Sequence, residues 1–175
     1  MQSTNGIRKV AIDGSLTTNV GTLAFQDLID TRKLLGAYSA NPRDCLWIFN
    51  QDTLNKSLGL SEFLEAYKNG QSSTIFTGAL SNILGSDIIV IEDFGLTEAD
   101  GKLSTTPGNN TLGGFSYIYK PAIQYGFGQS IEIEASKIPG KGVQLTGTFE
   151  FGFAIAQKLA GNTASSVALG INATV

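Results

Sequence analysis

The feature that most constrains this chain is a stretch near its C-terminus, residues 143–157, in which apolar residues alternate with polar or small ones. A repeat of two residues is typical of a β-strand with one apolar face. Fifteen extended residues would span roughly 50 Å at about 3.3 Å each. A compact domain of 175 residues has a radius of gyration of only about 16 Å. We therefore expect this strand to project from the body of the protein or to link two lobes.

The same part of the chain is poor in charge. From Gln144 to Val175 only Glu150 and Lys158 are charged, and charged residues make up 15% of the whole sequence, against roughly 25% in an average soluble domain. A long protrusion with so little charge is prone to aggregate unless another chain covers it. The pattern therefore predicts a subunit of an assembly.

Composition also excludes several kinds of function. The chain has no histidine and one cysteine, Cys45, so it lacks a Ser–His–Asp triad, a Cys–His pair, an intrachain disulfide and a cysteine-rich zinc site. Its 12 basic residues form no cluster and its net charge is −3, which argues against a specific nucleic-acid site. No apolar run has the length of a membrane span, and the first residues lack the apolar segment of a secretory signal. We expect a non-enzymatic, cytosol-made protein without cofactor, metal or membrane partner.

The order of predicted elements indicates a mixed α+β or α/β lobe in which helices cover a small sheet. Residues 1–21 are polar and rich in glycine, with one short extended segment expected at Arg8–Ile12. Helical spacing then predicts a helix from Thr22 to about Ser39, with Thr22 as its N-cap. Further strands are predicted at 45–49, 88–91, 115–120, 122–126, 129–136 and 166–171, besides the long one.

Two strands are apolar on both faces and should lie inside the sheet. We predict as core residues Trp47 and Phe49 in the first strand, and Ile89 and Ile91 in the second. Cys45, next to these apolar residues, is interpreted as a buried structural thiol rather than a reactive one.

The motifs that resemble reactive sites lack the context that chemistry requires. The tripeptide at 93–95 matches a kinase metal-binding motif, but the other kinase motifs are missing. Gly126-Phe127-Gly128 lacks the third glycine of a dinucleotide site and is interpreted as a bend. Four carboxylates at Glu92, Asp93, Glu98 and Asp100 match no calcium-loop spacing and are interpreted as solvated. Glu132 and Glu134 are interpreted as the solvent face of a strand.

The order and spacing of several segments resemble the major capsid proteins of tailed bacteriophages. In that family a helix ends near an alanine–tyrosine pair, here Ala37-Tyr38, and a polar link leads to an apolar strand with a tryptophan, here Trp47–Asn50. The stretch Ile83–Val90 is similar to the leucine–glycine strand that follows in the family. The strands from Phe115 to Gly128 and the two C-terminal strands complete the order, so that the resemblance covers about residues 23–173.

The resemblance implies the Hong Kong 97-like capsid fold, an α+β fold with an axial and a peripheral domain. Residues 40–142 would form the axial domain, and 22–39 with 143–175 part of the peripheral domain, after an N-terminal segment at 1–21. Full members have about 300 residues with an N-terminal arm and an extended loop, so this chain would match their C-terminal part. The spine helix and long antiparallel strands would belong to the peripheral domain.

The resemblance further implies a structural subunit of an icosahedral bacteriophage capsid, which assembles with copies of itself into pentamers and hexamers. Other capsid or scaffolding proteins are further candidate partners. The protein would be made in the bacterial host cytoplasm and end in the virion. The candidate interface residues lie in the charge-poor loop 95–114 and in the long strand: Thr105, Pro107, Asn109, Asn110, Leu112, Phe149, Phe151 and Phe153.

Three alternatives remain at this point. An encapsulin-like compartment subunit would have the same fold as the capsid protein. A small-molecule or peptide-binding α+β module would use loop 95–114 as a lid, but leaves the long bare strand unexplained. A histidine-free enzyme would need an acidic pocket built from Glu92, Asp93, Glu98 and Asp100.

Overall fold

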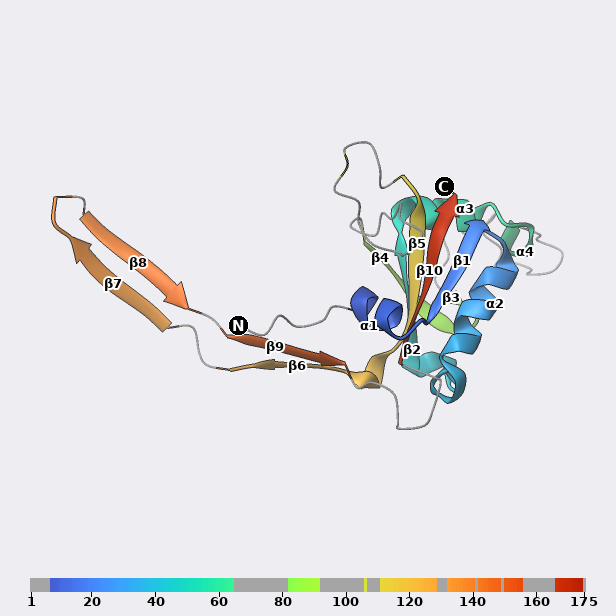
Figure 1. The fold of residues 1–175 in the computed structure, drawn as a ribbon, viewed down its shortest axis with the longest axis horizontal. Helices are drawn as coiled ribbons and strands as arrows, with labels where there is room; N and C mark the ends of the chain where they lie inside the picture. Colours follow the sequence, from blue (N-terminus) through green and yellow to red (C-terminus); the bar gives the residue numbers. More distant parts are fainter. Residues whose placement is uncertain are drawn as a thin grey trace.

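The computed structural model describes residues 7–64, 82–91, 106, 111–128, 132–140, 142–148, 150–155 and 166–174. They form a body, in which helices cover a mixed sheet, and a long β-arm that projects from it (Figure 1). The sheet has six strands in the order β1-β10-β5-β2-β4-β3. Their bounds are β1 Thr17–Thr22, β2 Cys45–Asn50, β3 Asn82–Ile83, β4 Ser86–Ile91, β5 Gly113–Tyr119 and β10 Val167–Thr174.

This sheet joins segments that the sequence analysis assigned to different domains. Strand β10 pairs in parallel with β1 and antiparallel with β5, and β5 in turn pairs antiparallel with β2. One sheet therefore contains strands from the predicted segments 1–21, 40–142 and 143–175, and the division into axial and peripheral domains stays a prediction. Strands β1 and β10 share a hydrogen-bonded ladder and an apolar core with strands in 40–142.

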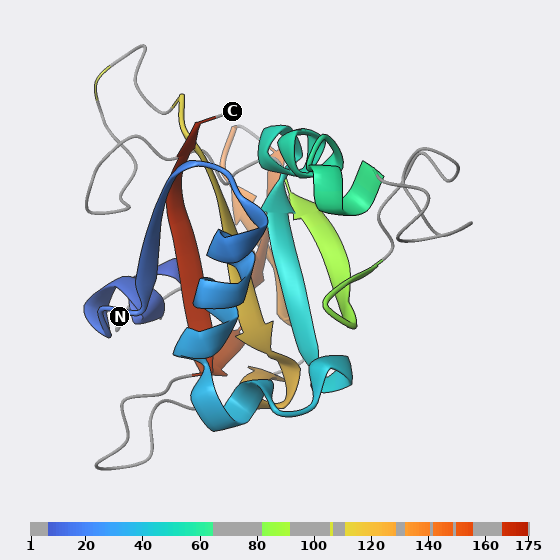
Figure 2. The same ribbon diagram turned by 90° about the vertical axis from the view of Figure 1, so that its right-hand side faces the viewer.

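Helices α1 (Ile7–Asp13), α2 (Phe25–Leu34), α3 (Gln51–Leu58) and α4 (Ser61–Leu64) belong to the body. Helix α2 lies across one face of the sheet (Figure 2). Helix α1 packs beside β10 and contributes to the apolar cluster of the other face. The extended segment expected within α1 was wrong, because a helix places Ile7, Ala11 and Ile12 together against that cluster, which a strand would not do.

Helix α2 is shorter at both ends than predicted. Its N-cap is Ala24 rather than Thr22, and the side chain of Asp27 accepts a hydrogen bond of 2.8 Å from the Ala24 backbone N–H. At the other end Gly36 has a φ of 54°, which L-residues avoid, and the chain continues as the 3₁₀ helix η1 (Gly36–Ser39).

The core beneath α2 is built on aromatic rings from β2 and β5. The rings of Trp47 and Tyr117 lie 4.1 Å apart between centroids, and those of Phe49 and Phe115 lie 5.4 Å apart. All four side chains are fully buried, as expected for Trp47 and Phe49. The indole N–H of Trp47 donates a 3.0 Å hydrogen bond to the backbone oxygen of Ile83, which ties the turn before β4 to the core.

The prediction that Ile89 and Ile91 lie in the core was wrong, since their side chains are 48% and 39% exposed. They point to the sheet face opposite α2, because Ile48 pairs with Ile89 and Asn50 with Ile91. The two-residue strand β3 pairs only with the start of β4. An apolar run therefore lies near the edge of the sheet, with the side chains of Ile89 and Ile91 exposed.

The arm consists of two antiparallel ribbons, β6 (Ile123–Phe127) with β9 (Phe151–Ile155) and β7 (Glu132–Ile138) with β8 (Gly142–Thr148). The projection of this region is confirmed, but the predicted single strand 143–157 is divided into β8 and β9 (Figure 1). From the hydrogen bond between Gly128 and Glu150 to the pairing of Glu132 with Thr148, the chain advances four residues on one side of the arm and two on the other. Such an excess shifts the register and bends a ribbon.

The 3₁₀ helix η4 (Lys120–Ala122) joins β5 to the arm, and η2 (Pro42–Asp44) precedes β2. At the base of the arm, Ile123 and Ile155 pack against the cluster of Ile118, Val167 and Leu169 in the body. The expected turn in 137–141 is confirmed between β7 and β8, where Gly140 and Gly142 have positive φ.

Gly170→Ala should destabilise the body by roughly 1–3 kcal/mol, the usual cost of overpacking. A Cβ at Gly170 would overlap the ring of Phe115, which is itself held between Trp47 and Phe49. The measurement is urea unfolding followed by tryptophan fluorescence. Gly126→Ala is the matched control, because no atom lies within 4 Å of a Cβ built there. Equal stability of the two variants would contradict this packing.

Candidate subunit-contact surfaces

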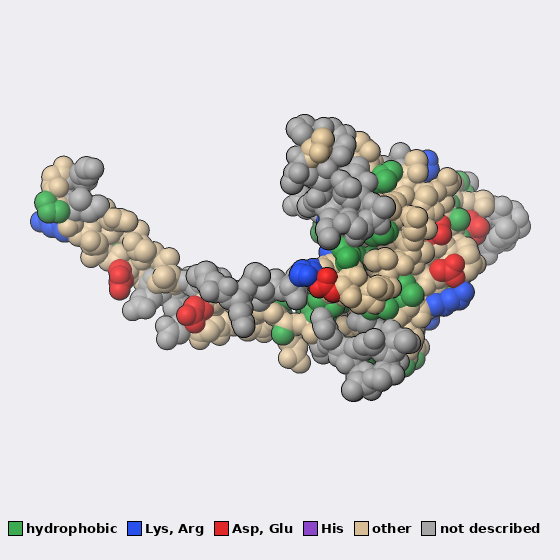
Figure 3. Space-filling view, viewed as in Figure 1, with side chains coloured by type: hydrophobic (Ala, Val, Ile, Leu, Met, Phe, Trp, Pro, Cys, Tyr) green, Lys and Arg blue, Asp and Glu red, His purple; other side chains and the backbone are tan. Residues whose placement is uncertain are grey.

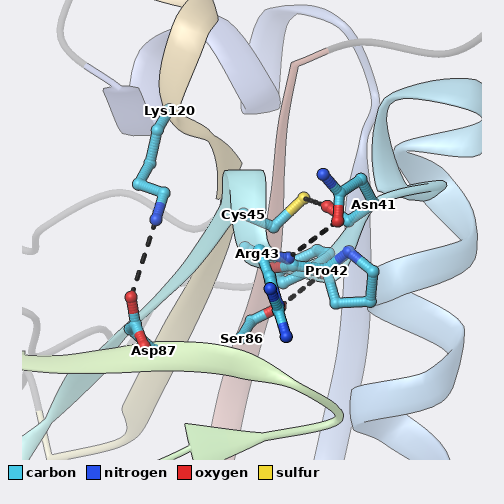
Figure 4. Close-up of polar contacts among 8 residues, drawn as sticks. Asn41, Pro42, Arg43, Cys45, Ser86, Asp87 and Lys120 are labelled. Atoms are coloured by element: carbon cyan, nitrogen blue, oxygen red, sulfur yellow. Dashed lines mark hydrogen bonds and ion pairs between the residues drawn. The ribbon is translucent and has the colours of Figure 1, made fainter.

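A buried polar cluster stands at the end of the sheet where β2, β4 and β5 meet (Figure 4). The Ser86 hydroxyl donates to the backbone oxygen of Pro42 at 2.7 Å and lies 3.0 Å from the Tyr117 hydroxyl. The Cys45 thiol lies 3.5 Å from the backbone oxygen of Tyr38, and burial raises its pKa. A buried thiol with a raised pKa is a poor nucleophile. This cluster holds strands together and offers no reactive group at the surface.

Stability should fall between pH 10 and pH 12 through Tyr117. Burial, then the hydrogen bond with Cys45, raises the pKa of this hydroxyl from 10.0 to about 12. Above pH 10 Tyr117 is ionised in the unfolded chain but still protonated in the folded chain. The free energy of unfolding therefore falls by about 2–3 kcal/mol by pH 12. Urea unfolding at several pH values measures the slope, and Tyr117→Phe should reduce it. An unchanged slope in that variant would refute the assignment.

Among the described residues there is no group of three or more cysteine and acidic side chains placed to hold a metal ion. Glu92, Asp93, Glu98 and Asp100, the carboxylates of the enzyme alternative, lie outside the described residues. Within the described chain, no helix is long and apolar enough to cross a membrane.

The β7–β8 ribbon has one apolar and one polar face. Residues directly opposite each other in an antiparallel ladder share a face. Ile133 pairs with Gly147, Ala135 with Leu145, and Lys137 with Val143, so that these side chains lie together on the apolar face. The opposite face carries Glu134, Ser136, Gln144, Thr146 and Thr148. Both faces are exposed, and Leu145 is 70% exposed.

The β6–β9 ribbon continues this pattern with aromatic residues. Ile123 faces Ile155, Tyr125 faces Phe153, and Phe127 faces Phe151 on one side of the ribbon. Tyr125 is 72% exposed, and its ring lies 6.1 Å from that of Phe127. The other side carries only Gln124, Gly126, Gly152 and Ala154. An isolated two-stranded ribbon is marginal in water, and an exposed aromatic face on one is a candidate contact surface.

The arm stands clear of the body and exposes more apolar surface than the largest patch of a typical monomer. In Figure 3 its visible side carries acidic side chains spaced along the ribbon. At roughly 150–200 Å² per large side chain, its exposed apolar residues present about 700 Å². The largest patch on a typical monomer is roughly 300–600 Å², and one partner contributes about 800 Å² to a standard interface. These residues are Tyr125, Phe127, Ile133, Val143, Leu145 and Phe151.

A second apolar surface lies on the body, on the sheet face opposite α2. It consists of Ile89 and Ile91 from β4, which are exposed, and Leu46 and Ile48 from β2, which are half-buried. The parallel register of β2 and β4 places Leu46 beside Asp87 and Ile48 beside Ile89 on this face. Asp87 is exposed at its rim, 3.6 Å from the ammonium of Lys120 (Figure 4). Such an exposed ion pair contributes little stability.

The structure describes only some of the predicted interface residues. Phe151 is exposed on the arm, and Phe153 and Leu112 are half-buried. Outside the described residues lie Thr105, Pro107, Asn109, Asn110 and Phe149. Sequence reasoning missed Tyr125, Phe127 and Ile133. The signal that could have found them was the two-residue alternation in 123–127 and 133–137, which matches the alternation in the strands that pair with them.

The sequence matches no model of a known protein family and no curated protein. The structure, however, is similar to solved ones. A chain described as "Mycobacterium phage Che8" gives a TM-score of 0.61 at 14% identity, covering 93% of this chain and 55% of that one. One described as "Capsid of empty GTA particle computed with C5 symmetry" gives 0.53 at 14% identity, with 90% and 49% covered. "Asymmetric unit of bacteriophage PhiM1 mature capsid" gives 0.51 at 9%, with 88% and 50% covered.

This chain has the Hong Kong 97-like capsid fold. The α+β class expected from the sequence is confirmed. The chain spans about half the length of the solved chains that it matches. The similarity to these structures extends over the body and into the arm, because the alignments cover about nine-tenths of the chain.

Exposed and anchored residues of the arm should differ in their effect on stability. Combined Tyr125→Ser and Leu145→Ser should change the free energy of unfolding by only about 0.5 kcal/mol per site, because both side chains already lie in water. Ile155→Ser should cost about 1–2 kcal/mol, because Ile155 packs against the body. Urea unfolding measures both variants. The double variant should also bind less of a hydrophobic fluorescent dye, and unchanged dye binding would contradict an open apolar face.

Proposed function

We propose that this chain is a structural, non-enzymatic subunit of a bacteriophage-type icosahedral capsid, and that it resides in the virion. The observation that carries this proposal is the combination of the capsid fold with an arm whose apolar face lies open to solvent. The fold is shared with solved capsids at 9–14% identity. An enzyme or small binding module has no need for an exposed aromatic ribbon, whereas a shell subunit buries such surface on assembly.

The partners in this proposal are copies of the chain, arranged as pentamers and hexamers, with other capsid or scaffolding proteins as further partners. Phe151 and Phe153 on the arm, and Leu112 before β5, are proposed contact residues. In this proposal residues 40–142 belong to the axial domain, and residues 22–39 with 143–175 belong to part of the peripheral domain. Low charge supports this role, because association buries mainly apolar and neutral polar surface.

Mass measured by light scattering after size exclusion tests the proposal. Over a tenfold range of concentration, we expect species well above the 18.5 kDa of one chain, and ring- or shell-shaped particles in electron micrographs. Combined Tyr125→Ser, Phe127→Ser and Phe151→Ser should weaken association at least tenfold, since it removes the aromatic face.

Gln124→Ser is the matched control, because Gln124 lies on the opposite side of the same ribbon. It should associate like the unaltered chain. An 18.5 kDa monomer at every concentration would contradict the proposal. Association that the triple variant leaves unchanged would exclude the aromatic face as a contact surface.

A further inference from the structure

We propose that the apolar face of the β7–β8 ribbon of one copy packs on the sheet face opposite α2, at its exposed β4 side, in the body of a second copy. This inference rests on the proposed function and specifies which surfaces meet. The first surface consists of Ile133, Ala135, Lys137, Val143 and Leu145. The second consists of Leu46, Ile48, Asp87, Ile89 and Ile91.

The two surfaces match in kind. Each is one face of a β-sheet, and each carries aliphatic side chains that lie in register on neighbouring strands. Sheet faces of this type pack against each other at about 10 Å, with their side chains interdigitated. Ile133, Val143 and Leu145 are each about two-thirds exposed, and Ile89 is about half exposed. Both faces therefore have apolar surface to bury.

The two surfaces also match in charge. Lys137 is the only charged residue that the ladder places on the apolar face of the ribbon. Asp87 is the only charged residue that the parallel register of β2 and β4 places on the body face. Its exposed contact with Lys120 at 3.6 Å is weak and leaves room for a second cation. Packing these faces together pairs Lys137 with a carboxylate.

The occupant of the body face is a second copy rather than the chain's own arm. The arm leaves the base of the body and extends away from it, with the β7–β8 ribbon at its far end (Figure 1). Two arms could instead pair through their apolar faces. That arrangement would bury two Lys137 ammonium groups in an interface to which the ladder brings no carboxylate, and unpaired buried charges are costly.

A contact between two different surfaces has a consequence for assembly. Each copy then offers an arm to one neighbour and a body face to another, so contacts continue from copy to copy until a ring closes. A contact between identical surfaces would stop at a dimer. The proposed contact therefore supplies the kind of interface that a closed shell requires.

Cysteine cross-linking distinguishes these arrangements. One preparation of the full chain carries Leu145→Cys and another carries Ile89→Cys, while the native Cys45 is buried. After treatment with a short bismaleimide, the mixture should give at least tenfold more cross-linked dimer than either preparation alone. Thr146→Cys replaces Leu145→Cys as the matched control, because it lies on the polar face of the same ribbon. It should give only background cross-linking.

Each other outcome overturns the inference. Strong cross-linking of the Leu145→Cys preparation by itself would show that arms pair with arms. Equal cross-linking by Thr146→Cys would show that the contact does not select the apolar face. Background cross-linking throughout, with assembly of the unaltered chain intact, would refute this contact but leave the proposed function standing. A chain that never associates would refute both.

Exchanging the two charges provides an independent test. Lys137→Glu should weaken association several-fold, because it places a carboxylate against Asp87. Adding Asp87→Lys in the same chain should restore most of the lost association. Asp87→Lys alone should associate more weakly than the unaltered chain. Lys33→Glu, on helix α2 and outside both surfaces, is the control and should leave association unchanged. Failure of the double variant to recover would refute the proposed pairing.

Discussion

The packing of Trp47 against Tyr117 and Phe115 is the interaction on which the rest of the body depends. These rings bring β2 and β5, whose paired residues lie 66 to 74 positions apart in the chain, into one buried layer. The indole N–H donates a hydrogen bond to the backbone oxygen of Ile83 and so ties that turn to the layer. Leu28 of helix α2 and Leu35, the C-cap residue that follows the helix, cover the layer. Because β10 lies beside β5, and Gly170 leaves space for the Phe115 ring, the C-terminal strand also depends on this cluster.

A rigid body of this kind makes an exposed arm possible. The arm has little core of its own, and its base is held by Ile123 and Ile155 against the second apolar cluster. Its stability therefore derives from the body, and its exposed face is free to serve association. The exposed large apolar side chains among the described residues are thus concentrated on the arm and on β4.

Much of the fold could be predicted because local patterns agreed with the tertiary structure. The apolar run at 45–49, the turn at 137–141 and the final strand all lie close to their predicted positions. The prediction failed where environment rather than pattern decides. The apolar residues of Arg8–Ile12 fit either a strand or a helix, and packing against β10 selected the helix. Ile89 and Ile91 belong to a run that predicts burial on both faces, but β4 lies near the sheet edge.

The sequence by itself determined that the chain folds as an α+β protein, lacks the residues for common catalysis, and carries a projecting charge-poor strand, since composition and periodicity are local properties. Only the tertiary structure decided that β1 and β10 join the central sheet and that strand 143–157 divides at a register shift. Both depend on which strands pair across the chain. The contact surfaces were also beyond the sequence, because a face is open or covered according to residues distant in the chain.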